Sequence, residues 1–164
     1  MIVVSDTSPI INLAMIGRLE LLPALFGEVI IPYKVFEEIT QRGGTMPGAE
    51  AVLAARWVET RSCTNTVLVQ ALRTQLDSGE AEAIALALEL ESGLLLIDEK
   101  MGRQVARGFS LSVMGLIGVL TLAKRKGLIL EMKSVLDELI QRAGFRISDD
   151  LYQAVLKKEG ELPG

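Results

Sequence analysis

The chain has 164 residues, of which 49% are apolar, and its formal net charge is −4 at pH 7. This length suits one domain with a proper core, and the acidic balance argues against a protein that coats nucleic acid non-specifically. The chain contains no histidine and a single cysteine, Cys63. These absences exclude a Ser-His-Asp or Cys-His relay, a His-ligated metal site, a cysteine zinc cluster and an internal disulfide. Catalysis would depend on carboxylates, lysines, hydroxyls and a hard cation held by oxygen ligands, Mg²⁺ or Mn²⁺.

The apolar runs are all broken by charges or glycines before about 18 residues, so we expect no membrane span. Met1-Ile2 leads directly into a predicted strand without a basic flank, from which we expect no signal peptide. The lone Cys63 is consistent with a reducing compartment. We therefore expect a cytoplasmic protein, and because no linker-like stretch divides it, a single domain over residues 1–164.

The N-terminal half of the chain opens with a strand that delivers a carboxylate. A β-branched apolar run ends in Asp6 and is followed by Ser8-Pro9, a helix cap and a helix-opening proline. Gln41 to Gly48, rich in glycine, is a predicted loop and a candidate lid or substrate guide. Apolar spacing and breaker residues predict the other elements of this half: strands at 27–31 and 57–60, and helices at 9–16, 18–25, 33–40, 49–56 and 66–76.

The C-terminal half contains a second apolar strand that is followed by an aspartate. Asp77 and Glu80 have the spacing of a capping box before a buried helix over 80–91, which we expect Gly93 to end. An apolar strand at 94–97 then again ends in a carboxylate, Asp98. The remaining predicted elements are a helix at 98–105, a strand at 111–114 and helices at 115–126, 131–142 and 149–158. Strands and helices alternate, which predicts an α/β fold whose mainly parallel sheet is covered on both faces.

Four acids fall at strand ends or near helix starts: Asp6, Glu38, Glu80 and Asp98. In open α/β sheets ligands bind beyond the carboxyl ends of the strands, so one crevice would suit all four. There they would repel one another and shift upward in pKa unless a divalent cation neutralised them. Simpler roles also exist, since Asp6 can start a turn and Glu80 can complete the capping box. The acids alone suggest metal-dependent phosphotransfer or a nuclease site.

Four motifs in order resemble the PIN domain family: Asp6-Thr-Ser8 after an apolar strand, Val35-Phe-Glu-Glu38-Ile39, Leu76-Asp-Ser-Gly-Glu80, and Leu95-Leu-Ile-Asp98-Glu-Lys-Met-Gly-Arg103. The tail from Gly115 to Ser148 is similar to a prokaryotic PIN-like subfamily close to the VapC toxins. The resemblance covers essentially the whole chain. It implies a three-layer α/β/α sandwich, with a helical C-terminal extension at about 128–164.

The resemblance also implies a Mg²⁺- or Mn²⁺-dependent endoribonuclease. Its catalytic and metal-binding acids would be Asp6, Glu38, Glu80 and Asp98, with Glu99 as an alternative ligand to Asp98, because the usual toxin pattern has Thr-x-Asp after that strand. Glu80 stands where the family usually has an aspartate. We expect the substrate-binding residues to be Thr7, Ser8, Lys100, Arg103 and Arg107, with the three basic residues following single-stranded RNA or tRNA.

The sequence leaves several interpretations of the function open. A PIN-like protein that binds nucleic acid or a partner without cutting it is the main alternative. A haloacid-dehalogenase-type phosphatase also begins with a strand-end aspartate, but that class resembles Asp-x-Asp, and position 8 here is serine. Similarity to toxin nucleases further suggests a homodimer and a small antitoxin protein whose basic side chain would fill the acidic pocket.

Overall fold

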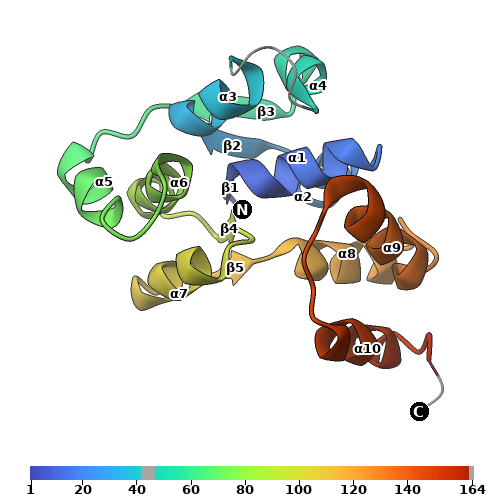
Figure 1. The fold of residues 1–164 in the computed structure, drawn as a ribbon. Coiled ribbons are helices and arrows are strands. Elements are labelled where there is room, and N and C mark those ends of the chain that lie inside the picture. The colour runs from blue at the N-terminus through green and yellow to red at the C-terminus, as the bar shows by residue number, and fades with distance from the viewer. Residues whose placement is uncertain (42–46, 163–164) are drawn as a thin grey trace.

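A computed structural model describes residues 1–41 and 47–162. The predicted loop at 41–48 falls mostly outside these residues. Within them no helix is both long and apolar enough to cross a membrane. The chain forms a central sheet with helices packed on both of its faces (Figure 1).

Within the described residues the sheet has five strands, all parallel, in the order β3-β2-β1-β4-β5. The strands are β1 (Val3–Ser5), β2 (Val29–Pro32), β3 (Val58–Arg61), β4 (Leu94–Leu96) and β5 (Val113–Met114). From β1 the chain moves outward through β2 and β3, then returns to place β4 on the other side of β1. The strand order therefore reverses between β1 and β4, and this switch point is where open α/β sheets form their binding crevice.

Ten helices connect and cover these strands in the described part of the chain. They are α1 (Thr7–Met15), α2 (Leu21–Phe26), α3 (Tyr33–Thr40), α4 (Ala49–Ala54), α5 (Thr66–Leu72), α6 (Ser78–Glu89), α7 (Lys100–Gly108), α8 (Leu116–Arg125), α9 (Met132–Ala143) and α10 (Asp149–Lys158). The predicted three-layer α/β/α sandwich is confirmed, and its sheet is wholly parallel.

Two apolar cores lie on the opposite faces of the sheet. Because side chains alternate along a strand, Val3 and Leu96 enter one core while Val4 and Leu95 enter the other. The first core is covered mainly by α1, α2, α8 and α9, and the second by α5, α6 and α7. Both cores leave the carboxyl ends of β1 and β4 free to carry polar side chains.

The C-terminal helices belong to the first of these cores. Helix α9 packs against α1 and α8, and Leu156 of α10 is fully buried. Lys124 Nζ lies 2.5 Å from Glu161 Oε2, which ties the end of the chain to α8. The expected extension at about 128–164 thus consists of two helices, α9 and α10, and their packing holds the connection between them beside the strand ends.

Several predicted helix boundaries differ from the structure; the helix predicted at 66–76, for example, ends at Leu72. Two differences at the ends of β4 have a clear physical reason. Gly93 does not end α6, because the helix ends at Glu89 and it is Glu91 that takes the left-handed conformation, with φ of 51°. A Cβ on Gly93 would lie 2.3 Å from Met1 Cγ, so this glycine makes room for the N-terminal side chain. Asp98 does not begin the following helix, which starts at Lys100 with Glu99 as its N-cap.

Candidate metal and nucleic-acid site

Asp6 lies at the switch point, directly after β1. Its backbone N–H donates to Leu96 O at 2.9 Å, which fixes it beside the end of β4. It is the N-cap residue of α1, yet its side chain makes no capping hydrogen bond, and it is only 4% exposed. Burial, and then the negative charges of nearby acids, raise the pKa of Asp6 from 3.8 to about 8, although a backbone hydrogen bond from Thr7 opposes this.

The charges that act on Asp6 belong to Glu80, Asp77 and Glu38, and all three oppose its ionisation. Asp6 is therefore a buried carboxylate surrounded by other carboxylates. This is an arrangement that costs free energy until a proton or a cation neutralises it.

Glu38 comes to this site from the second turn of α3. Thr7 Oγ1 donates to Glu38 Oε2 at 2.6 Å, which holds the carboxylate against the start of α1. A Cβ on Gly79 would lie 2.9 Å from the same oxygen, so the first turn of α6 closes on Glu38 from the other side. Its neighbour Glu37 instead pairs with Lys34 at 2.9 Å, so only Glu38 of this acidic pair faces the site.

Glu80 lies on the first turn of α6. The predicted capping box is present, because Glu80 N–H donates to Asp77 Oδ1 at 2.9 Å and Asp77 N–H donates to Glu80 Oε2 at 3.4 Å. Burial and the charge of Asp77 raise the pKa of Glu80 to about 7, with Glu99 adding to the effect. Glu80 therefore has a structural role and also contributes negative charge to the site.

The structure separates Asp98 from Glu99. Asp98 Oδ1 accepts a hydrogen bond of 2.9 Å from Leu116 N–H at the start of α8. Arg103 donates to the backbone carbonyl of Asp98 and lies 4.0 Å from its carboxylate. Glu99, in contrast, is exposed and its charge acts on Glu80. At the β4 end, Glu99 is thus the acid whose charge acts on Glu80, while the Asp98 carboxylate accepts a hydrogen bond from the start of α8.

These side chains supply only oxygen donors, which are the donors that Mg²⁺ and Mn²⁺ prefer. Within residues 1–41 and 47–162, however, no three acidic or cysteine side chains are gathered closely enough to hold a metal ion. Glu38 and Glu80 are turned toward the hydroxyl of Thr7 and the backbone of Asp77. The donor set fits a hard divalent cation in its chemistry, and the flexible glutamate arms would have to converge on Asp6.

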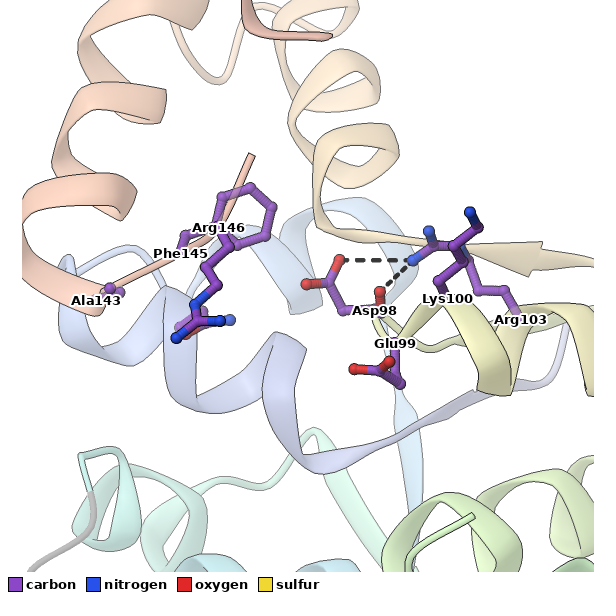
Figure 2. Close-up of a pocket in the computed structure, with 9 residues that line it drawn as sticks. Asp98, Glu99, Lys100, Arg103, Ala143, Phe145 and Arg146 are labelled. Atoms are coloured by element: carbon purple, nitrogen blue, oxygen red, sulfur yellow. Dashed lines mark hydrogen bonds and ion pairs between the residues drawn. The ribbon is translucent and has the colours of Figure 1, made fainter. Parts of the chain in front are cut away.

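A cavity of about 370 Å³ adjoins the acids on the β4 side. Figure 2 shows Asp98 and Glu99 along one wall of this cavity and Phe145 and Arg146 along the opposite wall. Lys100 and Arg103, two of the predicted substrate-binding residues, also line it. Arg107 lies one turn further along α7, exposed and outside the lining, and Ser8 is exposed on the first turn of α1.

Five residues that line this cavity were not predicted as site residues: Asn12, Ala143, Gly144, Phe145 and Arg146. Asn12 lies four residues after Ser8, so the two share one face of α1. Phe145 and Arg146 come from the connection between α9 and α10, far from the other lining residues in the sequence. No motif marks them, and only the packing of α9 against α1 places them here.

A parallel α/β/α sheet with a buried carboxylate at its switch point is the architecture that the resemblance to PIN domains predicted. A family model described as a PIN domain, DUF3368, matches residues 2–161, and the chain belongs to this family. The family is part of a nuclease superfamily whose members typically use divalent metals. No curated protein matches the chain.

Among solved structures, the chain is similar to a PilT N-terminus domain protein from the hyperthermophilic archaeon Sulfolobus solfataricus. The two share 20% sequence identity with a TM-score of 0.53, over 74% of this chain and 92% of the archaeal one. At this identity the match establishes the shared fold.

Proposed function

We propose that this protein is a Mg²⁺- or Mn²⁺-dependent endoribonuclease that hydrolyses phosphodiester bonds in single-stranded RNA or tRNA. The observation that carries the proposal is Asp6, a 4% exposed carboxylate on which the negative charges of Glu80, Asp77 and Glu38 act. A bound cation would stabilise the ionised form of this carboxylate. A divalent cation held by carboxylates is also what metal-dependent nucleases use for catalysis.

The chain's own residues have distinct roles in this proposal. Asp6, Glu38, Glu80 and Glu99 would hold the metal, with Thr7 keeping the Glu38 carboxylate in position through its 2.6 Å hydrogen bond. A divalent cation bound there would supply a nucleophilic water at neutral pH and stabilise charge on the phosphate. Lys100 would contact the RNA backbone, while Asp98 and Arg103 fix the starts of α8 and α7 on which this wall depends.

The cleavage assay compares labelled single-stranded RNA and tRNA incubated with the purified protein and Mn²⁺, Mg²⁺ or EDTA. We expect cutting that requires metal and falls by at least about a hundredfold in Asp6→Asn, because the metal supplies several kcal/mol of transition-state stabilisation. Asp150→Asn is the matched control, since Asp150 is an exposed acid at the start of α10. Retained cutting in Asp6→Asn would rule out this site.

A non-catalytic PIN-like protein that binds nucleic acid or regulates a partner is the second candidate. It is favoured by one observation: in the described residues no three acids are gathered closely enough to hold a metal ion. Metal binding without turnover on any RNA, from folded protein free of a partner, would support this candidate.

We further propose that the protein is the toxin of a toxin-antitoxin pair and acts as a homodimer in the cytoplasm. An acidic site suits a basic plug, so a small partner protein with an Arg or Lys at the cleft would inhibit it. Co-purification of such a protein, encoded by a neighbouring gene, tests the pairing, and a chain that always purifies alone would contradict it. Light scattering of the purified chain tests the dimer.

A further inference from the structure

The cavity of about 370 Å³ beside the acids is lined by more basic than acidic residues. It lies between the start of α7 and the connection from α9 to α10 (Figure 2). Two acids and three basic residues line it: Asp98, Glu99, Lys100, Arg103 and Arg146.

The negative charge of Asp98 is already used within the protein. Its carboxylate accepts the Leu116 N–H and lies beside Arg103, which also donates to its backbone carbonyl. Across residues 1–41 and 47–162, neither Lys100 nor Arg146 forms an ion pair. These two cations are therefore the groups in the cavity that remain available to an anionic ligand.

The connection that carries Arg146 is anchored. Gly144 ends α9 in the left-handed conformation with φ of 68°, and Phe145 N–H then donates to Leu139 O at 3.0 Å. The Phe145 ring is partly buried and packs against the first core. The backbone at Arg146 is consequently already held in place. Less conformational entropy is therefore lost when its guanidinium group binds a ligand.

Glu99 and helix α1 link the cavity to the acidic site. Glu99 lines the cavity, and its charge also acts on Glu80 at the other site. Helix α1 makes a second link, because Asp6 precedes it while Asn12 lines the cavity one turn after the exposed Ser8. An anion held here would lie next to the metal-binding acids rather than among them.

We propose that this cavity binds a backbone phosphate of single-stranded RNA, one next to the phosphate that is cleaved, through Arg146 and Lys100. The inference rests on the proposed ribonuclease function and adds to it a substrate contact from the C-terminal extension. Arginine suits this role because its planar guanidinium group can donate two parallel hydrogen bonds to a phosphate. Asn12, with an amide in the same wall, adds a polar contact to the adjoining sugar or phosphate.

The test is fluorescence anisotropy of a labelled single-stranded RNA of about 12 nucleotides, measured in EDTA so that metal-dependent cleavage does not occur. We expect Arg146→Ala to weaken binding about fivefold to tenfold and to reduce the slope of log K against log salt by about 0.7. Arg146→Lys should recover part of the loss because it keeps the charge.

Arg142→Ala is the matched control, since Arg142 is an exposed arginine of the last turn of α9 that pairs with Glu138 at 3.4 Å. It removes the same charge outside the cavity, and we expect less than about a twofold change in binding. Circular dichroism of each variant checks that the fold is kept.

Equal binding by Arg146→Ala and Arg142→Ala would overturn this inference, as would a wild-type protein that binds no RNA. Loss of a co-purifying acidic protein from Arg146→Ala, with RNA binding unchanged, would replace it with a peptide-binding site. Because the assay does not depend on cutting, the two proposals fail separately. Arg146-dependent binding without cleavage would overturn only the nuclease function, and cleavage without Arg146-dependent binding would overturn only the phosphate site.

Discussion

Asp6 and Asp98 both follow the carboxyl end of an apolar strand, Asp6 directly after β1 and Asp98 two residues after β4, yet their surroundings differ. Each follows an apolar strand, and β1 and β4 are neighbours. The Asp98 carboxylate receives the N–H of Leu116 and lies beside Arg103, so its charge is satisfied within the protein. Asp6 is more deeply buried, and this burial, together with the charges of Glu80, Asp77 and Glu38, raises its pKa to about 8.

The difference shows that a strand-end aspartate does not by itself define a metal site. A carboxylate that accepts a helix N-terminal N–H and has an arginine beside it stabilises the fold. A carboxylate buried among acids stores electrostatic repulsion, which binding of a cation relieves. The two ends of neighbouring strands are thus expected to respond differently to mutation, pH and metal.

The largest difference is expected from substitutions at the β4 end. Glu99→Gln should lower RNA cleavage by about a hundredfold, because it removes a carboxylate whose charge reaches Glu80. Asp98→Asn should change cleavage by less than about threefold, since an asparagine oxygen can still accept the Leu116 N–H. Single-turnover cleavage rates measure both, and the opposite ranking would show that Asp98 is the ligand.

The pH dependence of stability separates the two aspartates in the metal-free protein. The folded-state pKa of Asp6 is about 8 against an ordinary value of 3.8, so the folded protein holds a proton that the unfolded chain releases. Stability should therefore fall as the pH rises from about 4 to about 8. Asp6→Asn should flatten this fall, leaving the smaller contribution of Glu80, whose pKa is about 7.

Thermal melts in EDTA across that pH range test this expectation. Asp98→Asn serves as the control, because it alters the other strand-end aspartate and leaves Asp6 intact. A wild-type melting temperature that rises steadily between about pH 4 and pH 8 would contradict the raised pKa of Asp6.

The positioning of Glu38 can be tested from both sides. Thr7→Val removes the hydroxyl that donates to Glu38 at 2.6 Å, and Gly79→Ala places a Cβ where the Glu38 carboxylate lies. Each should lower cleavage about tenfold, an effect typical of groups that orient metal ligands. Titration of the activity with Mn²⁺ should show that more metal is required, and an unchanged metal requirement would mean that Glu38 is not a ligand.

The smallest effect is expected from removing the structural role of Asp98. Asp98→Ala leaves the Leu116 N–H without its acceptor and should lower the free energy of unfolding by about 1 kcal/mol, as the loss of a helix cap does. Urea denaturation measures the change. Asp98→Asn, which keeps an acceptor, should unfold close to the wild type, and equal losses in the two variants would refute the capping role.

Much of the fold was predictable because local signals agreed with the tertiary structure. Apolar strands ending in breakers, and helices with clear starts such as the Asp77 capping box, fixed the order of the elements. The errors arose where the role of a residue is set by a contact with a residue distant in the sequence. Gly93 makes room for Met1, and Asp98 is held by Leu116 of α8 instead of starting α7. Both contacts depend on how strands and helices come together.

The candidate site was predictable in part for the same reason. The switch-point position of Asp6 followed from the strand pattern, and Glu38 followed from the family motif. Which of Asp98 and Glu99 is a ligand stays a prediction, and the preference for Glu99 depends on a contact that the sequence does not show, the hydrogen bond from the start of α8 to Asp98. Arg146 could not be found from the sequence, because it reaches the cavity only through the packing of α9 on α1.

The most direct test of the contrast between the two aspartates is the thermal shift caused by Mn²⁺ or Mg²⁺ at about pH 8, where the ionised acids of the Asp6 site repel one another most. Wild type, Asp6→Asn and Asp98→Asn are measured side by side. We predict that metal raises the melting temperature of the wild type and of Asp98→Asn but leaves Asp6→Asn unchanged. An equal rise in all three proteins would contradict the assignment of the metal to Asp6 and its acidic neighbours.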